Sequence, residues 1–251
     1  MARPVAPPAK RYLGMDVLTA SRERISWVFD SFPRICVSFS GGKDSSVMTH
    51  LVLEQAIARG RKVGLLFLDW EAQFALTIAH VEEMFSRYGD HIEPYWVALP
   101  LTTTNAVSQV EPEWTCWDPA KRELWVRQPP ERAITDPDAL PFHYPEITFE
   151  EFAPAFAEWY AQRVPTASFI GIRAAESLNR WRAVTKARKS RLEGRAWTAW
   201  KGGEAFNHAH PVNSHGPTAT GCTHASEYSS SYVGASHSAP SPSSERNPLN
   251  G

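Results

Sequence analysis

The chain has 251 residues, 43% of them apolar, and its 26 basic and 27 acidic side chains leave a net charge of −1. This length suits one α/β domain, alone or with an appendage, and the apolar share is sufficient for a packed core. The near-zero charge excludes a global attraction to nucleic acid or to membrane surfaces. Because there is no apolar run of membrane-spanning length and no signal-peptide core, we expect a cytoplasmic protein without a membrane partner.

In chain order, alternating apolar runs and breaker residues predict a regular series of elements. They are a flexible Pro-rich arm at 1–16, a helix at 17–29, a strand at 34–39, a helix ending near Gly60, a strand at 63–68, a helix at 74–88 and a strand at 91–99. Pro94 indicates an edge position or a bulge for the last strand. Strands that alternate with helices predict βαβ units and a parallel sheet.

Between the first strand and its helix stands the octapeptide Phe-Ser-Gly-Gly-Lys-Asp-Ser-Ser at 39–46. Glycines allow backbone N–H groups to approach phosphate oxygens, and a helix N-terminus adds unpaired donors and a favourable dipole. Lys43 supplies a positive charge, and Ser45 and Ser46 supply hydroxyl donors. The alternative is a glycine-rich turn that only joins a strand to a helix, but the combination of strand, glycines, lysine and helix favours a phosphate cradle.

The common P-loop is excluded, since Asp44 rather than Ser or Thr follows the lysine. The octapeptide instead resembles the pyrophosphatase loop (PP-loop), Ser-Gly-Gly-x-Asp-Ser, of ATP-pyrophosphatase ligases, tRNA thiolases and phosphoadenosine phosphosulfate (PAPS) reductases. Asp69 ends the second strand at the same sheet edge, where its carboxylate suits adenine, ribose or a metal. A cap for the following helix is the equally weighted alternative for Asp69.

Residues 100–165 depart from the βαβ rhythm and form a predicted irregular Trp- and Pro-rich insertion, which we interpret as a lid, a specificity element or a surface for a protein partner. Its tail, 148–163, is predicted to be helical, with Thr148 and Glu151 as a capping box and Pro154 delaying or kinking the start. Cys116 lies between tryptophans without a nearby histidine, so we interpret it as a packing residue rather than a nucleophile.

A fourth strand at 166–172 brings Arg173 to the rim where the cradle lies, and its planar guanidinium suits phosphate or sulfate. A basic helix follows, with its cationic side chains at 180–195. A solvated helix face is the favoured interpretation of these charges, with a nucleic-acid patch as the alternative.

The PP-loop and the later segment Gly-Ile-Arg-Ala-Ala-Glu-Ser at 171–177 together resemble the PAPS reductase family. Residues 68–74 and 114–118 resemble a branch that includes the immunoglobulin-binding regulator A proteins, and the resemblance covers roughly 18–206. It implies an adenine nucleotide alpha-hydrolase-like sandwich with a nucleotide-binding domain at 17–206. By motif position, the implied nucleotide ligands are Ser40, Gly41, Gly42, Lys43, Asp44, Ser45, Asp69 and Arg173, with Lys43 and Arg173 also in catalytic roles.

Two features depart from the family. Its C-terminal catalytic cysteine motif, Glu-Cys-Gly-x-His, has no counterpart here, because Cys222 lies in a differently spaced Gly-Cys-Thr-His context. From Asn207 onward the chain is rich in serine and histidine and has no Ile, Phe, Met or Trp, which predicts a disordered tail at 207–251. A truncated or out-of-frame end near Asn207 is one hypothesis for that change. The cysteines and the irregularly spaced histidines predict neither an iron–sulfur cluster nor a metal site.

Our leading hypothesis is a PAPS reductase-like protein that binds PAPS or ATP and, if active, directs attack on a phosphorus or sulfur centre. Mg²⁺ is expected if the ligand is ATP. Two alternatives stay open: an ATP-pyrophosphatase that adenylates a substrate, and a nucleotide-sensing regulator without turnover.

Overall fold

The computed structural model describes residues 14–105, 107–108, 110–171, 192–195, 197–200 and 206–209. The helices are α1 (Val17–Ser31), α2 (Lys43–Ala58), α3 (Ala75–Arg87) and α4 (Phe149–Ala161). The strands are β1 (Arg34–Ser38), β2 (Val63–Leu68), β3 (Ile92–Val97), β4 (Leu101–Thr104), β5 (Glu113–Cys116), β6 (Thr166–Ile170), β7 (Thr198–Trp200) and β8 (Phe206–Ala209). The predicted site residue Arg173, most of the basic helix, and the tail from residue 210 with Cys222 lie outside the described residues.

The main sheet has the strand order β3-β2-β1-β6-β8-β7. All neighbouring pairs are parallel except β7 and β8, which run antiparallel. The predicted parallel α/β sheet is therefore confirmed, and β3, which carries Pro94, lies at its edge as expected. The sequence did not predict β7 and β8; β8 begins at Phe206, where we had placed the end of the domain.

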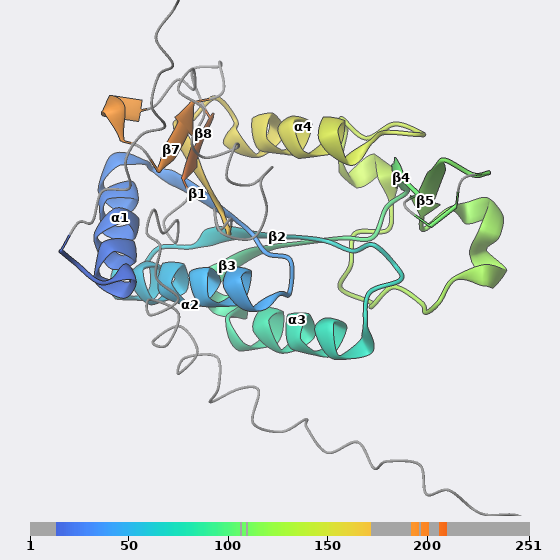
Figure 1. Ribbon diagram of the computed structural model, residues 1–251, viewed down its shortest axis with the longest axis horizontal. Coiled ribbons are helices and arrows are strands. Elements are labelled where there is room, and N and C mark those ends of the chain that lie inside the picture. The colour runs from blue at the N-terminus through green and yellow to red at the C-terminus, as the bar shows by residue number, and fades with distance from the viewer. Residues whose placement is uncertain are drawn as a thin grey trace, which may run out of the picture. The chain divides into compact units, whose positions relative to one another are not determined.

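Helices cover both faces of this sheet because the strand side chains alternate between two cores. On β1, Ile35 and Val37 join one apolar cluster and Cys36 joins the other. The first cluster is completed by α1, α2 and α3, and the second by α4 together with the segment between β3 and α4. Figure 1 shows α4 across the sheet from α2 and α3. This arrangement is the predicted sandwich.

The helix ends follow local sequence signals. The predicted capping box of α4 is present: the Glu151 N–H donates to Thr148 Oγ1 (3.3 Å), and the Thr148 N–H donates to Glu151 Oε2 (3.0 Å). Pro154 lies inside α4 and does not delay its start at Phe149. After α2, Gly60 adopts a φ of +60°, a left-handed conformation that suits glycine at a helix end.

The segment predicted to be an irregular insertion has more structure than the sequence indicated. Strands β4 and β5 form an antiparallel hairpin, in which Leu101 pairs with Cys116. Leu101, Cys116 and Trp117 are buried in the cluster that α4 joins, so the hairpin shares the core of the main sheet. Within the described residues, no helix has the length and hydropathy that a membrane crossing requires.

Candidate functional site

The PP-loop lies where the connectivity of the sheet reverses. From β1 the chain proceeds through α2 and α3 to β2 and β3 on one side, and it later returns to β6 on the other side. Ser38 of β1 pairs with Ile170 of β6, so the segments that follow these two strands leave the same sheet edge side by side. Parallel α/β sheets bind ligands beyond the carboxyl ends of their strands at such a switch point.

Gly41 fixes the loop against α3. Its φ is +74°, a left-handed value that favours glycine. A Cβ at this position would lie 2.7 Å from Thr77 Cγ2 and 3.0 Å from Val81 Cγ2. Both the backbone conformation and the close approach of α3 therefore require a glycine.

The serine hydroxyls of the loop bond chiefly to the loop itself. Ser45 Oγ and Ser46 Oγ each donate to the Gly42 carbonyl at 2.9 Å. Because the single proton of Ser45 is used in that bond, the 2.9 Å contact between Ser40 Oγ and Ser45 Oγ is a donation from Ser40. Ser45 and Ser46 are buried, so their hydroxyls stabilise the conformation of the loop.

The open side of the loop presents the start of α2. Gly42 is the N-cap of α2 and provides no side-chain acceptor for the first turn, whose N–H groups have no partner within the helix. Lys43 is the first residue of α2 and is exposed, whereas Asp44 beside it is half-buried. A helix N-terminus with an exposed ammonium group is an anion site.

Gly171 brings the end of β6 against the start of α2. A Cβ on Gly171 would lie 3.2 Å from Ser45 Cα and 3.3 Å from the Ser45 nitrogen, so a larger residue would require the two backbones to move apart by a few tenths of an ångström. Gly171 opens the predicted Gly-x-Arg segment. The place of Arg173, two residues further on, stays a prediction because that residue lies outside the described range.

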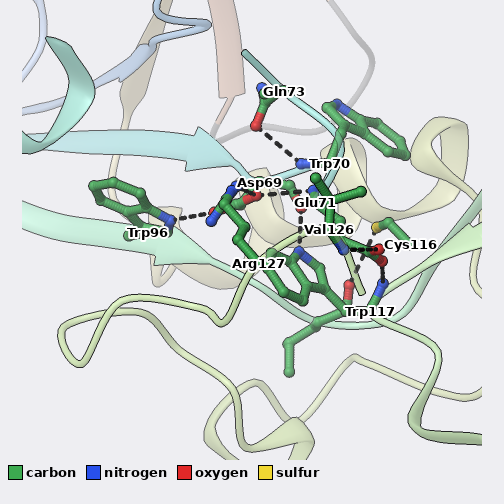
Figure 2. Close-up of polar contacts among 10 residues, drawn as sticks. Asp69, Trp70, Glu71, Gln73, Trp96, Cys116, Trp117, Val126 and Arg127 are labelled. Carbon is green, nitrogen blue, oxygen red and sulfur yellow. Dashed lines mark hydrogen bonds and ion pairs between the residues drawn. The ribbon is translucent and has the colours of Figure 1, made fainter. Parts of the chain in front are cut away.

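Asp69 is buried at the end of β2 and is enclosed by donors (Figure 2). Its carboxylate accepts hydrogen bonds from Trp96 Nε1 (2.8 Å) and the Glu71 N–H (2.9 Å), and it forms an ion pair with Arg127. The N-cap of α3 is Phe74, so the interpretation of Asp69 as the cap of that helix is wrong. The geometry favours a supporting role, and a contact between Asp69 and adenosine stays a prediction.

Glu71 attaches the insertion to the same turn. Its buried carboxylate accepts hydrogen bonds from the backbone N–H groups of Trp117 (2.8 Å) and Val126 (3.3 Å). Trp117 Nε1 in turn donates to the Asp69 carbonyl at 2.6 Å, and the Arg127 guanidinium lies over the Trp117 ring, 5.1 Å from its centroid. Sequence reasoning missed the roles of Glu71 and Arg127. The signal available in the sequence was the presence of two acidic residues, Asp69 and Glu71, directly after a buried strand.

The two described cysteines are buried. Cys116 Sγ lies 3.6 Å from the Leu99 carbonyl, and burial raises the pKa of Cys36 and of Cys116 to about 12. The predicted packing role of Cys116 is therefore confirmed. Among the described residues, no group of three or more His, Cys, Asp or Glu side chains is arranged to hold a metal ion.

Comparisons with known proteins bear on the family that this chain resembles. Residues 34–135 match the family model described as phosphoadenosine phosphosulfate reductase domain. The uncharacterized protein YbdN of Escherichia coli strain K12 is 52% identical over 197 residues, which cover 77% of this chain and 48% of YbdN. The chain thus spans about half the length of this curated relative.

Two solved structures resemble the chain distantly. The FMN adenylyltransferase of Candida glabrata, in complex with ATP, has a TM-score of 0.38 and 13% identity and covers 81% of this chain and 54% of its own. The U34-tRNA thiolase NcsA of Methanococcus maripaludis, with its [4Fe-4S] cluster, has a TM-score of 0.40 and 11% identity and covers 92% and 69%. At these TM-scores the likeness supports no functional argument. The PP-loop and the matched residues 34–135 are thus similar to the phosphoadenosine phosphosulfate reductase domain, in line with the resemblance of the sequence motifs.

Proposed function

We propose that this protein binds an adenine nucleotide, PAPS or ATP, with its phosphates at the N-terminus of α2. The observation that supports this most is the exposed Lys43 on a glycine-capped helix start at the switch point between β1 and β6. The Lys43 ammonium and the first-turn N–H groups would neutralise the phosphate or sulfate oxygens, and Arg173 would add a second cation from the β6 side. If a phosphorus or sulfur centre is attacked there, the same groups stabilise the charge that develops on it.

ATP would bring Mg²⁺ to the site. Asp44 is the acid of the loop, and its carboxylate would be the protein group available to help hold that ion beside the phosphates. When bound, Mg²⁺ would neutralise phosphate charge. PAPS would need no metal of this kind, so the metal requirement separates the two ligands.

Calorimetric titration with PAPS and with Mg-ATP tests the proposal. We expect saturable binding of one of them by the wild type and weaker binding by Lys43→Ala. Lys62→Ala is the matched control, because Lys62 is an exposed lysine just before β2, at the opposite edge of the sheet. Binding of neither nucleotide, or equal losses in the two variants, would contradict the proposal.

A second candidate, binding without thiol-dependent reduction, is favoured by the two cysteines within the described residues, both of which are buried, whereas Cys222 lies outside them. With pKa values of about 12, Cys36 and Cys116 supply no thiolate at neutral pH to attack a sulfonate. Such a protein would act as a nucleotide sensor. Sulfite release from PAPS with a thiol reductant would contradict this candidate, whereas pyrophosphate release from ATP would favour the adenylating alternative.

A further inference from the structure

A histidine from α3 reaches the hydroxyl network of the PP-loop. His80 Nε2 lies 2.7 Å from Ser46 Oγ, and its ring packs edge-on against Phe39, with 5.8 Å between the ring centroids. His80 is half-buried and stands outside the PP-loop motif, and the sequence analysis gave it no role. It is nevertheless the side chain through which α3 makes a hydrogen bond to this loop.

The available protons determine which ring nitrogen carries hydrogen. Ser46 has one hydroxyl proton, which it donates to the Gly42 carbonyl at 2.9 Å. With its proton in that bond, Ser46 Oγ can accept from His80 when the ring carries its proton on Nε2. Burial lowers the pKa of His80, which favours the neutral ring at pH 7, and a neutral ring with Nε2–H completes this hydrogen bond.

This chain of hydrogen bonds ends on the peptide that forms the anion site. The Gly42 carbonyl accepts from both serine hydroxyls and from the Ser46 N–H. In a trans peptide the carbonyl and the next N–H point in opposite directions. A Gly42 carbonyl held toward the helix therefore turns the Lys43 N–H outward, toward an incoming phosphate.

We propose that His80 is a positioning residue of the PP-loop: its Nε2–H holds Ser46, which holds the Gly42–Lys43 peptide in the orientation that binds phosphate. This inference rests on the proposed nucleotide binding and adds the residue that keeps the cradle preformed. His80 acts through Ser46 and does not itself touch the ligand.

The main test compares nucleotide affinity, PAPS and Mg-ATP each being titrated, in His80→Leu and His80→Gln. Leucine removes the hydrogen-bond donor, so we expect His80→Leu to bind nucleotide about 5-fold more weakly than the wild type. Glutamine carries an amide N–H the same number of bonds from Cβ as Nε2 of histidine, so we expect His80→Gln to bind within about 2-fold of the wild type. Ser46→Ala combined with His80→Leu should weaken binding no more than Ser46→Ala alone, because both remove one linkage. Full additivity or an unchanged His80→Leu affinity would overturn the inference.

His50→Leu is the matched control. His50 is a half-buried histidine on α2, one helical turn after Ser46, and its Nδ1 lies 2.9 Å from the Tyr88 hydroxyl. Its replacement should lower stability and leave nucleotide affinity unchanged. An affinity loss equal to that of His80→Leu would show that the effect comes from general loosening and would overturn the positioning role.

Two measurements on the ligand-free protein separate this inference from the proposed function. Long-range ¹H–¹⁵N NMR correlations should show His80 as the Nε2–H tautomer, and hydrogen exchange in peptides covering 39–46 should be faster in His80→Leu than in the wild type or His80→Gln. If the wild type binds neither nucleotide, the proposed function fails, while these measurements still decide the role of His80. An Nδ1–H tautomer, or unchanged exchange in His80→Leu, would overturn it.

Discussion

The PP-loop and the turn after β2 lie at the same edge of the sheet but are stabilised by different interactions. The PP-loop is stabilised by neutral hydroxyl bonds around the Gly42 carbonyl and by two glycines in close contact with neighbouring elements. The turn after β2 is stabilised by charge, with Asp69 and Glu71 buried under donors from the insertion. If the PP-loop binds an anion as proposed, neutral partners suit it better than buried carboxylates. The neighbouring turn, which carries the insertion, can use them.

The largest expected effect comes from breaking the charged region. Asp69→Ala leaves the Arg127 guanidinium without its ion partner next to Trp117, so we expect a loss of about 3–5 kcal/mol in the free energy of unfolding, measured by urea denaturation. Asp30→Ala is the control, since Asp30 pairs with Arg59 on the surface and should cost about 1 kcal/mol or less. Equal costs for the two variants would remove the distinction between the regions.

A smaller loss is expected where the neutral region depends on shape. Gly41→Ala combines a left-handed φ with a Cβ 2.7 Å from Thr77, and we expect about 2–3 kcal/mol of destabilisation together with weaker nucleotide binding. Gly60→Ala shares the left-handed φ but meets no atom within 4 Å, so it should cost about 1 kcal/mol and leave binding unchanged. If the two variants lose the same stability and bind nucleotide equally well, the contact between Gly41 and α3 contributes to neither property.

Lys43→Ala tests charge on the open face of the cradle without changing the fold. Nucleotide affinity should fall by about 10- to 100-fold, as expected for loss of a charged hydrogen bond to phosphate. The melting temperature should stay at the wild-type value because Lys43 is exposed. The affinity loss should also shrink at high salt, since screening weakens the interaction in the wild type. Calorimetry at two salt concentrations measures both effects.

A further prediction concerns pH and the buried thiols. The pKa of Cys36 and Cys116 is raised to about 12 in the folded protein, above the unfolded-chain value of about 8.5. The unfolded state therefore loses these protons first, so stability is complete below about pH 8.5 and declines as the pH rises from there toward 12. Urea titrations at pH 7.5 and 9.5 should show the decline. A Cys36→Ala, Cys116→Ala double variant should lose this part of the pH dependence.

The local patterns predicted the central fold well. The strand at 34–39, the glycine-rich loop and the edge strand with Pro94 could be inferred because each depends on residues adjacent in sequence. The network of Asp69, Glu71 and Arg127 could not, because it joins β2 to residues more than 40 positions away. The β4–β5 hairpin was missed because its short strands stand among prolines and tryptophans with no clear period. His80 was missed because its partner Ser46 lies 34 residues earlier.

The close approach of Gly171 to Ser45 helps to explain where insertions and deletions should be tolerated in this chain. Strands β1 and β6 are paired residue by residue, although they are far apart in the sequence and the segment between β3 and β6 lies between them. The position of the PP-loop relative to β6 therefore depends on the pairing of β1 with β6 and on the contact between Gly171 and Ser45. It does not depend on the length of the segment between β3 and β6. Residues can be added or removed at the tip of the β4–β5 hairpin without shifting the cradle. A single deletion within β6, by contrast, would slide every residue after it along β1 and separate the two halves of the site.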